Sequence, residues 1–243
     1  NFSELNRWVD SLGLEPTATF TNALDGFALS LTDAQIAAVE ALFPSAKVSE
    51  DAPISIDTTQ PSANWNLSML DQTTTPTDAQ YIYPDSAGSG VKVYVIDTGV
   101  AANATQLGSR LLAGRDFTFS GSTTDCNGHG THVAGSIASA TYGVAKQAKI
   151  VPLKALDSFG TCQGSGSTSF VLSAIDWAIS DNPAGTRAVI NMSLGSSDLT
   201  NSAAMTTAIN NAIADGIVVV VAAGNETKDA CQVTPALTPA AIT

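Results

Sequence analysis

The stretch VKVYVIDTGV, residues 91–100, decides the fold. Its first six residues are mostly apolar and rich in Val, which is typical of a buried strand. Asp97 follows this run directly, and a turn with Thr98 and Gly99 comes next. A carboxylate in this place is either a polar residue that ends the strand or a group with a chemical task. Residues elsewhere in the chain decide between these two interpretations.

Similar short apolar runs recur further along the chain, with helical patterns between them. The runs occupy residues 91–96, 150–153, 188–192 and 217–222, and the helical patterns occupy residues 131–139, 168–179 and 203–214. Strand and helix in repetition predict right-handed crossovers and a parallel sheet covered by helices on both faces. Continuous rather than alternating apolar strands favour the same arrangement. We therefore expect an α/β fold here.

The first 57 residues show a different pattern of short elements. Leu5, Trp8, Val9 and Leu12 share one face of a helix, and Thr32 begins a capping box with Gln35 that opens a second one. Two short strands are expected at 18–20 and 27–31, and a last one at 46–49. This predicts a small α+β domain over residues 1–57, followed by a larger domain over 58–243. Residues 50–90, rich in Thr, Pro, Ser and Asp, are expected to form a connection and surface loops.

Composition narrows the classes of function. Of 243 residues, 44% are hydrophobic and 13% are charged, which suits a folded protein. The net charge of -12 argues against nucleic acid or an anionic membrane as a partner, since both favour Lys and Arg. No apolar run reaches the roughly 20 residues of a membrane span. The chain has three Cys, so a disulfide would leave one thiol unpaired or paired outside this chain. Three buried free thiols are the alternative. The spacing of the Cys does not favour a zinc site.

Polar or glycine-rich residues follow three of the expected strands. Asp97 follows the first, Ser193-Leu194-Gly195 follow the third, and Asn225 follows the fourth after Ala223 and Gly224. An open parallel sheet carries its chemistry at the carboxyl ends of its strands. Ordinary strand-to-helix connections lie there too, so position alone gives only a weak preference for a functional site.

The two His of the chain fall in NGHGTHVAG, residues 127–135. A metal site at His129 and His132 lacks an acid at a suitable spacing. An imidazole that acts as a general base needs a carboxylate on its other nitrogen, and Asp97 can supply it to His129. Asn225 can donate its side-chain amide to an oxyanion, although a turn residue with positive φ explains it equally well.

Four segments in order, VYVIDTGV, NGHGTHVAG, NMSLG and VVVVAAGN, resemble the subtilisin-like serine peptidases over roughly residues 58–243. DCNGHGTHVAG and CQGSGSTS narrow the resemblance to the proteinase K branch and its aqualysin-like members. The resemblance implies that Asp97 is the acid of the catalytic triad, that His129 is its base, and that Asn225 donates to the oxyanion. Ser193, Leu194 and Gly195 would pair with the backbone of a polypeptide substrate. His132 would not be catalytic.

The same resemblance implies further features of the chain. Residues 1–57 are similar to the family's inhibitory propeptide, a ferredoxin-like α+β domain, with autoprocessing near 56–58. Cys126 and Cys162 would form a disulfide, and Cys231 would pair with a cysteine outside this chain. Asp71 and Gln72 match part of a structural calcium site, although Ser68 stands where an acid is expected. The enzyme would be secreted and monomeric.

The family's nucleophile lies in Gly-Thr-Ser-Met-Ala, which does not occur in residues 1–243. Ser167 and Ser169 are better explained as the start of a helix. We therefore expect a fragment of a secreted zymogen that is inactive by itself. A non-catalytic homologue that acts as a binding or inhibitory module is the alternative. An aspartic protease would need a second Asp-Thr/Ser-Gly and mostly antiparallel strands, and the chain offers neither.

Overall fold

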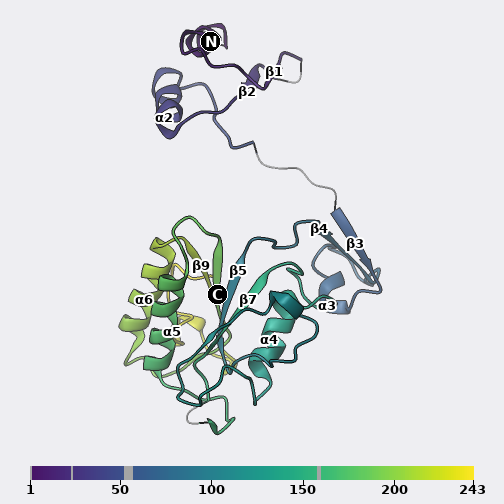
Figure 1. The fold of residues 1–243 in the computed structure, drawn as a ribbon, viewed down its shortest axis with the longest axis vertical. Helices are drawn as coiled ribbons and strands as arrows, with labels where there is room; N and C mark the ends of the chain where they lie inside the picture. The colour runs from purple at the N-terminus through teal and green to yellow at the C-terminus, as the bar shows by residue number, and fades with distance from the viewer. Residues whose placement is uncertain (1, 23, 52–56, 158–159) are drawn as a thin grey trace. The chain divides into compact units, whose positions relative to one another are not determined.

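The computed structural model describes residues 2–22, 24–51, 57–157 and 160–243. The chain divides into two compact units, Asn1–Ile54 and Ser55–Thr243 (Figure 1). The sequence places the boundary after residue 57, whereas Asp57 begins strand β3 of the second unit. The expected processing region lies partly outside the described residues.

The described part of the first unit contains two helices and a two-stranded antiparallel sheet. Its elements are α1 (Phe2–Ser11), β1 (Ala18–Phe20), β2 (Gly26–Ala28) and α2 (Asp33–Leu42). The capping box is confirmed, because the Gln35 backbone N–H donates to Thr32 Oγ1 and the Thr32 N–H donates to Gln35 Oε1. The strand expected at 46–49 is wrong. Those residues line a hollow instead of pairing with the sheet.

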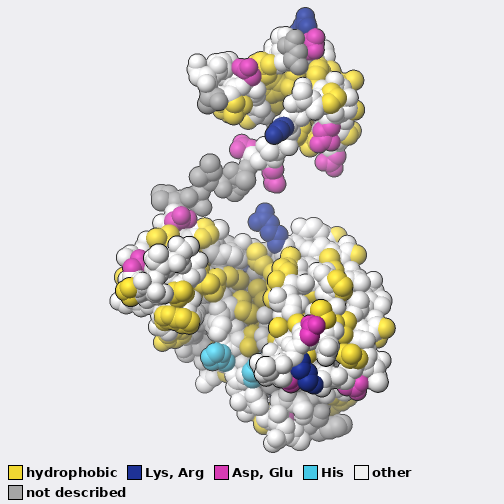
Figure 2. Space-filling view, turned by 180° about the vertical axis from the view of Figure 1, so that it is seen from behind, with side chains coloured by type: hydrophobic (Ala, Val, Ile, Leu, Met, Phe, Trp, Pro, Cys, Tyr) yellow, Lys and Arg dark blue, Asp and Glu magenta, His cyan; other side chains and the backbone are white. Residues whose placement is uncertain are grey.

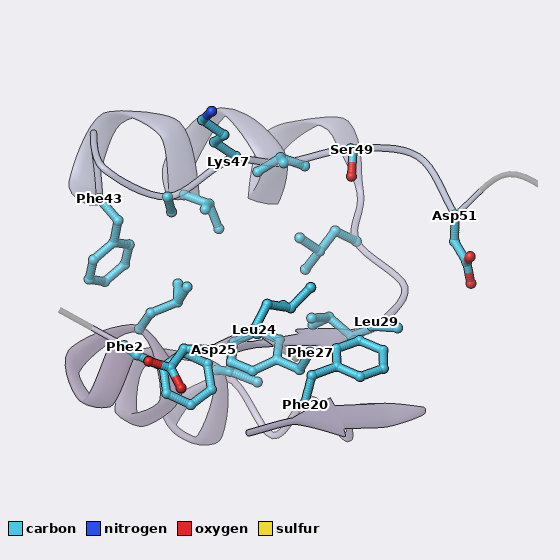
Figure 3. A pocket seen from close by; sticks show the side chains of 18 of the residues that line it. Phe2, Phe20, Leu24, Asp25, Phe27, Leu29, Phe43, Lys47, Ser49 and Asp51 are labelled. Carbon is cyan, nitrogen blue, oxygen red and sulfur yellow. The ribbon is translucent and has the colours of Figure 1, made fainter. Parts of the chain in front are cut away.

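The hollow of the first unit has a volume of about 1090 Å³ and is lined mainly by apolar side chains. Figure 3 shows the ring of Phe43 on one side of it and those of Phe2 and Phe27 on the other. Within the described part of this unit, Val9 and Val39 are the buried apolar residues. The elements of the first unit therefore surround a space that its own side chains do not fill.

The second unit is built on a five-stranded sheet with strand order β6-β7-β5-β8-β9, and all of its pairings are parallel. The strands are β5 (Lys92–Asp97), β6 (Arg115–Asp116), β7 (Lys149–Lys154), β8 (Ala188–Met192) and β9 (Ile217–Val221). The parallel sheet predicted from the sequence is confirmed. The two-residue edge strand β6 was not expected, because so short a segment carries no periodic pattern.

Helices cover both faces of this sheet, as expected. They are α4 (His129–Ala138), α5 (Thr168–Asp181) and α6 (Ser202–Ala214). Val93 and Val95 of β5 pack on the side of α4, while Tyr94 and Ile96 pack on the side of α5 and α6. Alternate residues of a strand point to opposite faces, so β5 is buried on both. In the described part of the chain, no helix has the length and apolar character needed to cross a membrane.

Residues 57–84 form more regular structure than the sequence predicts. Strands β3 (Asp57–Pro61) and β4 (Gln80–Pro84) pair in antiparallel fashion, and α3 (Trp65–Ser68) lies between them in the chain. Leu67 and Tyr81 are buried in a small cluster beside the pair. The strands are rich in Thr, Gln and Pro and are largely exposed, so they lack the apolar signal that identified the main sheet.

Candidate active site

Three strands of the main sheet end at one edge and bring distant residues to it. Asp97 is the last residue of β5, Ser193 follows β8, and Asn225 lies four residues beyond the end of β9. Because β5, β8 and β9 are adjacent and parallel, their carboxyl ends share this edge. The sheet thus gathers the segments that the sequence singled out.

Asp97 and His129 form a hydrogen-bonded pair at this edge. His129 Nδ1 lies 2.8 Å from Asp97 Oδ1 and 2.9 Å from Oδ2. The Asp97 carboxylate is fully buried and also accepts from the Thr98 backbone N–H at 2.7 Å. The His129 side chain is half exposed, and both His side chains are visible on one face of the second unit in Figure 2. The pairing expected between these two residues is therefore present.

Two opposing influences act on the Asp97 carboxyl. Burial raises the pKa of the Asp97 carboxyl, while hydrogen bonds from His129 and Thr98 act in the opposite direction. A carboxylate beside Nδ1 accepts a hydrogen bond from the N–H of that nitrogen, which leaves the lone pair on Nε2. Nε2 has no hydrogen-bond partner among the described residues. This geometry suits a general base that takes up a proton at Nε2.

Asn225 is exposed, and its backbone N–H donates to Glu226 Oε2 at 2.9 Å. Its side-chain amide makes no hydrogen bond to another described residue. The positive φ of this turn, 103°, belongs to Gly224 rather than to Asn225. The interpretation of Asn225 as a residue needed for a left-handed conformation is therefore wrong, and its amide is available to a ligand.

Residues 193–195 lead from the end of β8 to a short antiparallel contact. Asn191 Nδ2 donates to Ser193 Oγ at 3.0 Å. Beyond Leu194 and Gly195, Ser196 exchanges two backbone hydrogen bonds with Thr234, at 2.8 and 2.9 Å. A role of Ser193, Leu194 and Gly195 in holding a substrate backbone stays a prediction.

Cys126 and Cys162 form a disulfide with a Cα–Cα distance of 5.4 Å. The pairing implied by the resemblance is thereby confirmed. The bridge ties the segment before α4 to the loop that follows β7. Cys231 is exposed and free within the described part of the chain. Its pairing with a cysteine elsewhere stays a prediction.

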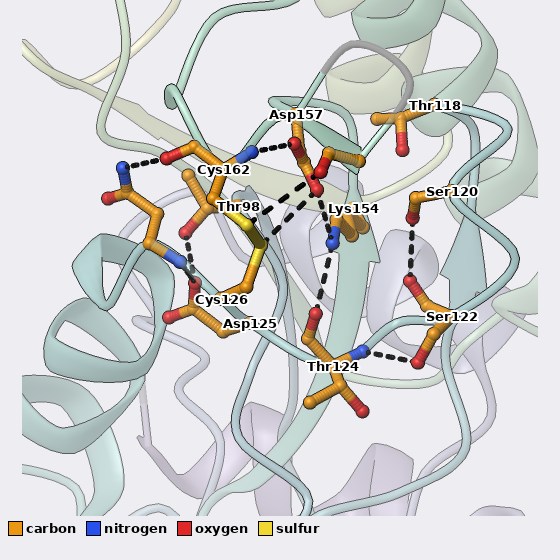
Figure 4. A network of polar contacts seen from close by, with 12 residues as sticks. Thr98, Thr118, Ser120, Ser122, Thr124, Asp125, Cys126, Lys154, Asp157 and Cys162 are labelled. Atoms are coloured by element: carbon orange, nitrogen blue, oxygen red, sulfur yellow. Dashed lines mark hydrogen bonds and ion pairs between the residues drawn. A yellow bond between two sulfur atoms is a disulfide. The ribbon is translucent and has the colours of Figure 1, made fainter.

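A buried ion pair beside the disulfide was not foreseen from the sequence. Lys154 Nζ lies 2.8 Å from Asp157 Oδ2 and donates to the Thr124 carbonyl at 3.0 Å (Figure 4). Asp157 Oδ1 accepts from the Cys162 backbone N–H at 2.5 Å. The hydrogen bond from Lys154 lowers the pKa of Asp157. Cys126, Asp157 and Cys162 also gather ligand atoms, but sulfurs joined in a disulfide offer no thiolate to a metal.

The expected calcium ligands Asp71 and Gln72 take part in loop hydrogen bonds. Asp71 Oδ2 accepts from the Ile82 backbone N–H at 2.5 Å, and Gln72 Oε1 accepts from that of Asp78 at 3.2 Å. Calcium takes about six to eight oxygen ligands. Among the described residues, no group of three acidic side chains converges at this place, so a calcium ion here would need carbonyl or amide oxygens or water as further ligands. Calcium binding here stays a prediction, and no chemical step depends on it.

Ser167 and Ser169 lie at the start of α5, as expected. Ser167 is the N-cap residue, but its side chain makes no capping hydrogen bond. Instead its Oγ lies 2.8 Å from Ser169 Oγ. His129 contacts Asp97 and neither of these serines. Ser167 and Ser169 therefore have no geometric link to the pair.

Comparisons of the sequence and of the structure with known proteins agree with each other. The sequence profile of the subtilase family matches residues 88–243. An "extracellular serine proteinase" of Thermus sp. is 42% identical over 237 residues, covering 96% of this chain and 55% of that protein. An "alkaline serine exoprotease A" of Vibrio alginolyticus is 36% identical over 237 residues, covering 95% and 42%. The chain therefore spans about half the length of these relatives.

Among solved structures, that of a "cold adapted subtilisin-like serine proteinase" aligns with a TM-score of 0.67 and 42% identity, covering 75% of this chain and 63% of that one. The structural match agrees with the sheet order and the flanking helices described above. With the profile match over 88–243, the chain belongs to the subtilase family of subtilisin-like proteins.

Proposed function

We propose that this chain carries the acid and the base of a secreted serine endopeptidase. The observation that carries the proposal is the hydrogen bond between His129 Nδ1 and the buried carboxylate of Asp97. In this mechanism His129 Nε2 accepts the proton of a serine hydroxyl that attacks a peptide carbonyl, and later delivers it to the leaving amine. Asp97 holds the imidazole in the required tautomer and stabilises the imidazolium.

The tetrahedral intermediate carries negative charge on its oxygen, and the Asn225 amide is our candidate donor to it. Its support is the unengaged amide at the same sheet edge as Asp97. Ser193, Leu194 and Gly195 are proposed to pair with the substrate backbone. The serine nucleophile is proposed to come from a longer form of the chain, because the relatives are about twice as long.

The first unit is proposed to act as an inhibitory propeptide. The match to the Thermus protein spans 237 residues and so must reach into this unit. The unit's hollow, incompletely packed interior also suits a segment that is not meant to persist by itself. We propose that the protein is secreted, because it contains a disulfide and because the Thermus relative is described as extracellular.

The test is to express the chain extended along its natural reading frame and to treat it with a serine-directed phosphonate. We expect labelling and turnover of peptide substrates. Asp97→Asn should lower kcat by about 10⁴-fold, because the imidazole then takes the wrong tautomer. His129→Ala should abolish turnover, whereas His132→Ala serves as a matched control, since His132 is exposed on the same helix. Absence of labelling would favour a non-catalytic homologue, and turnover that survives His129→Ala would refute the assignment of the base.

A further inference from the structure

The N-terminus of α4 is capped by a side chain from outside the helix. A helix leaves its first four backbone N–H groups without partners inside the helix. The N-cap residue is Gly128, with φ of 104° and no side chain to offer. Asp125 takes its place. Oδ1 accepts from the N–H groups of Asn127 and Gly128, each at 2.9 Å. Oδ2 accepts from the Thr131 N–H at 2.9 Å and from its hydroxyl at 2.6 Å.

Thr98 connects this capped terminus to the end of β5. Its hydroxyl donates to Asp125 Oδ1 at 2.9 Å (Figure 4). The same hydroxyl accepts from the Gly130 backbone N–H at 2.9 Å. The Thr98 side chain is buried. The residue that follows Asp97 is thus bonded to the residue that follows His129. Each member of the pair has a neighbour that fixes it to the other element.

The protonation state of Asp125 agrees with its role as the hydrogen-bond acceptor that caps α4. Burial by itself would raise the pKa of the Asp125 carboxyl, but hydrogen bonds from Thr131, Gly128 and Thr98 outweigh it and hold that pKa below its ordinary value. An ionised carboxylate only accepts hydrogen bonds, and every partner of Asp125 donates. Near neutral pH the arrangement therefore has the right protonation.

We propose that Thr98 and Asp125 are positioning residues for the Asp97–His129 pair. They hold the start of α4 against the end of β5, so that His129 Nδ1 meets both oxygens of Asp97. Neither residue contacts a reacting atom in this scheme. The inference rests on the proposed function for its catalytic consequence, but the structural part concerns this chain alone. A misplacement of roughly 1 Å in such a site can lower a rate by about 10²-fold.

The first test needs no catalytic activity. In the 243-residue chain labelled with ¹⁵N-histidine, the Nδ1–H proton of His129 is observed by NMR, and His132 serves as an internal reference. Thr98→Val removes the hydroxyl at nearly constant shape, and Asp125→Asn weakens the acceptor. We expect both to shift or abolish the His129 Nδ1–H signal. Thr98→Ser keeps the hydroxyl and should retain the signal.

Asp116→Asn is the matched control. Asp116 is also a carboxylate held by several donors, namely Thr118, Ser120 and Gly121, but it stabilises a loop and not α4. Its replacement should leave the His129 signal in place. An unchanged signal in folded Thr98→Val and Asp125→Asn overturns the proposal. So does unfolding of both variants by circular dichroism while Asp116→Asn stays folded, because the two residues would then be structural only.

The second test uses the extended, nucleophile-containing form. Thr98→Val should lower kcat by about 10²-fold with little change in KM, and Thr98→Ser should restore most of it. A change in KM alone would contradict a positioning role. If the extended form shows no activity, the proposed function fails, whereas the NMR result still decides whether Thr98 and Asp125 position the pair.

Discussion

Gly130 packs directly against the end of β5, with no room for a side chain. A Cβ atom at this position would collide with the carbonyl oxygen of Gly99 and would lie 3.1 Å from Asp97 Cβ. The helix that carries His129 can approach Asp97 so closely because residue 130 is glycine. This contact, with the hydrogen bond from the Gly130 N–H to Thr98, sets the distance between the two elements.

Gly130→Ala should therefore push α4 away from β5 and break the hydrogen bond between His129 and Asp97. Gly135 is the matched control in the same helix, because a Cβ there meets nothing within 4 Å. Gly135→Ala should stabilise the protein by up to about 1 kcal/mol, the difference in helix propensity. Chemical denaturation and the His129 Nδ1–H signal measure the two effects. Equal behaviour of both variants would contradict the steric explanation.

Lys154→Met should destabilise the second unit by about 3–5 kcal/mol, since it leaves the buried Asp157 without its cation. Lys154→Met combined with Asp157→Asn should cost less, because no uncompensated charge remains. Lys92→Met is the control: its ion pair with Asp181 is partly exposed and contributes about 0–1 kcal/mol. Urea denaturation of the variants ranks these costs. A double variant less stable than the single one would argue against the charge explanation.

Removal of the disulfide by Cys126→Ser with Cys162→Ser should lower the free energy of unfolding by about 4 kcal/mol. The value follows from the chain-entropy relation for a bridge that spans 36 residues. Cys231→Ser should leave stability unchanged, because Cys231 is exposed and free within the described part. Thermal unfolding of the variants provides the comparison, and an equal loss in both would contradict this account.

Acid should lower the free energy of unfolding through protonation of Asp116 and Asp125. Burial raises the pKa of each carboxyl, but the hydrogen bonds they accept outweigh it, and both pKa values lie below the ordinary value. Their stabilising contribution is present above the unfolded pKa of about 3.9 and is lost as pH falls through the folded pKa. Asp97, whose pKa is raised, contributes with the opposite sign.

Single variants separate these opposing contributions. Urea denaturation at pH 6 and pH 3 should show a smaller pH dependence for Asp116→Asn and for Asp125→Asn than for the parent chain. The same dependence in all three proteins would show that these carboxylates do not cause the acid sensitivity.

Residues 1–51 expressed alone should not form a stable domain. Val9 and Val39 are the buried apolar residues in the described part of this unit, and large side chains such as Leu24 and Leu42 are more than half exposed. So little burial does not offset the loss of conformational entropy on folding. We expect little amide protection in hydrogen exchange. Strong protection across α1 and α2 would overturn this prediction.

The sequence by itself determined the layered α/β architecture of the second unit. Runs such as 91–96 and 150–153 are apolar because both faces of the parallel sheet are covered there, and that pattern is readable without coordinates. It also identified the capping box at Thr32 and the motifs around Asp97 and His129, because these signals are local. It missed β3 and β4, whose largely exposed residues pair across about 20 positions of the chain and carry no periodic signal.

Only the tertiary structure decided how the site is held together. Asp125 caps α4, the Thr98 hydroxyl bridges Asp125 to Gly130, and Lys154 is buried against Asp157. These three features depend on contacts between β5, β7 and the segment before α4. Such contacts follow from strand order and from the approach of a helix, which no short stretch of sequence encodes. Hydrogen bonds of this kind depend on tenths of an ångström, and the packing of separate elements sets those distances.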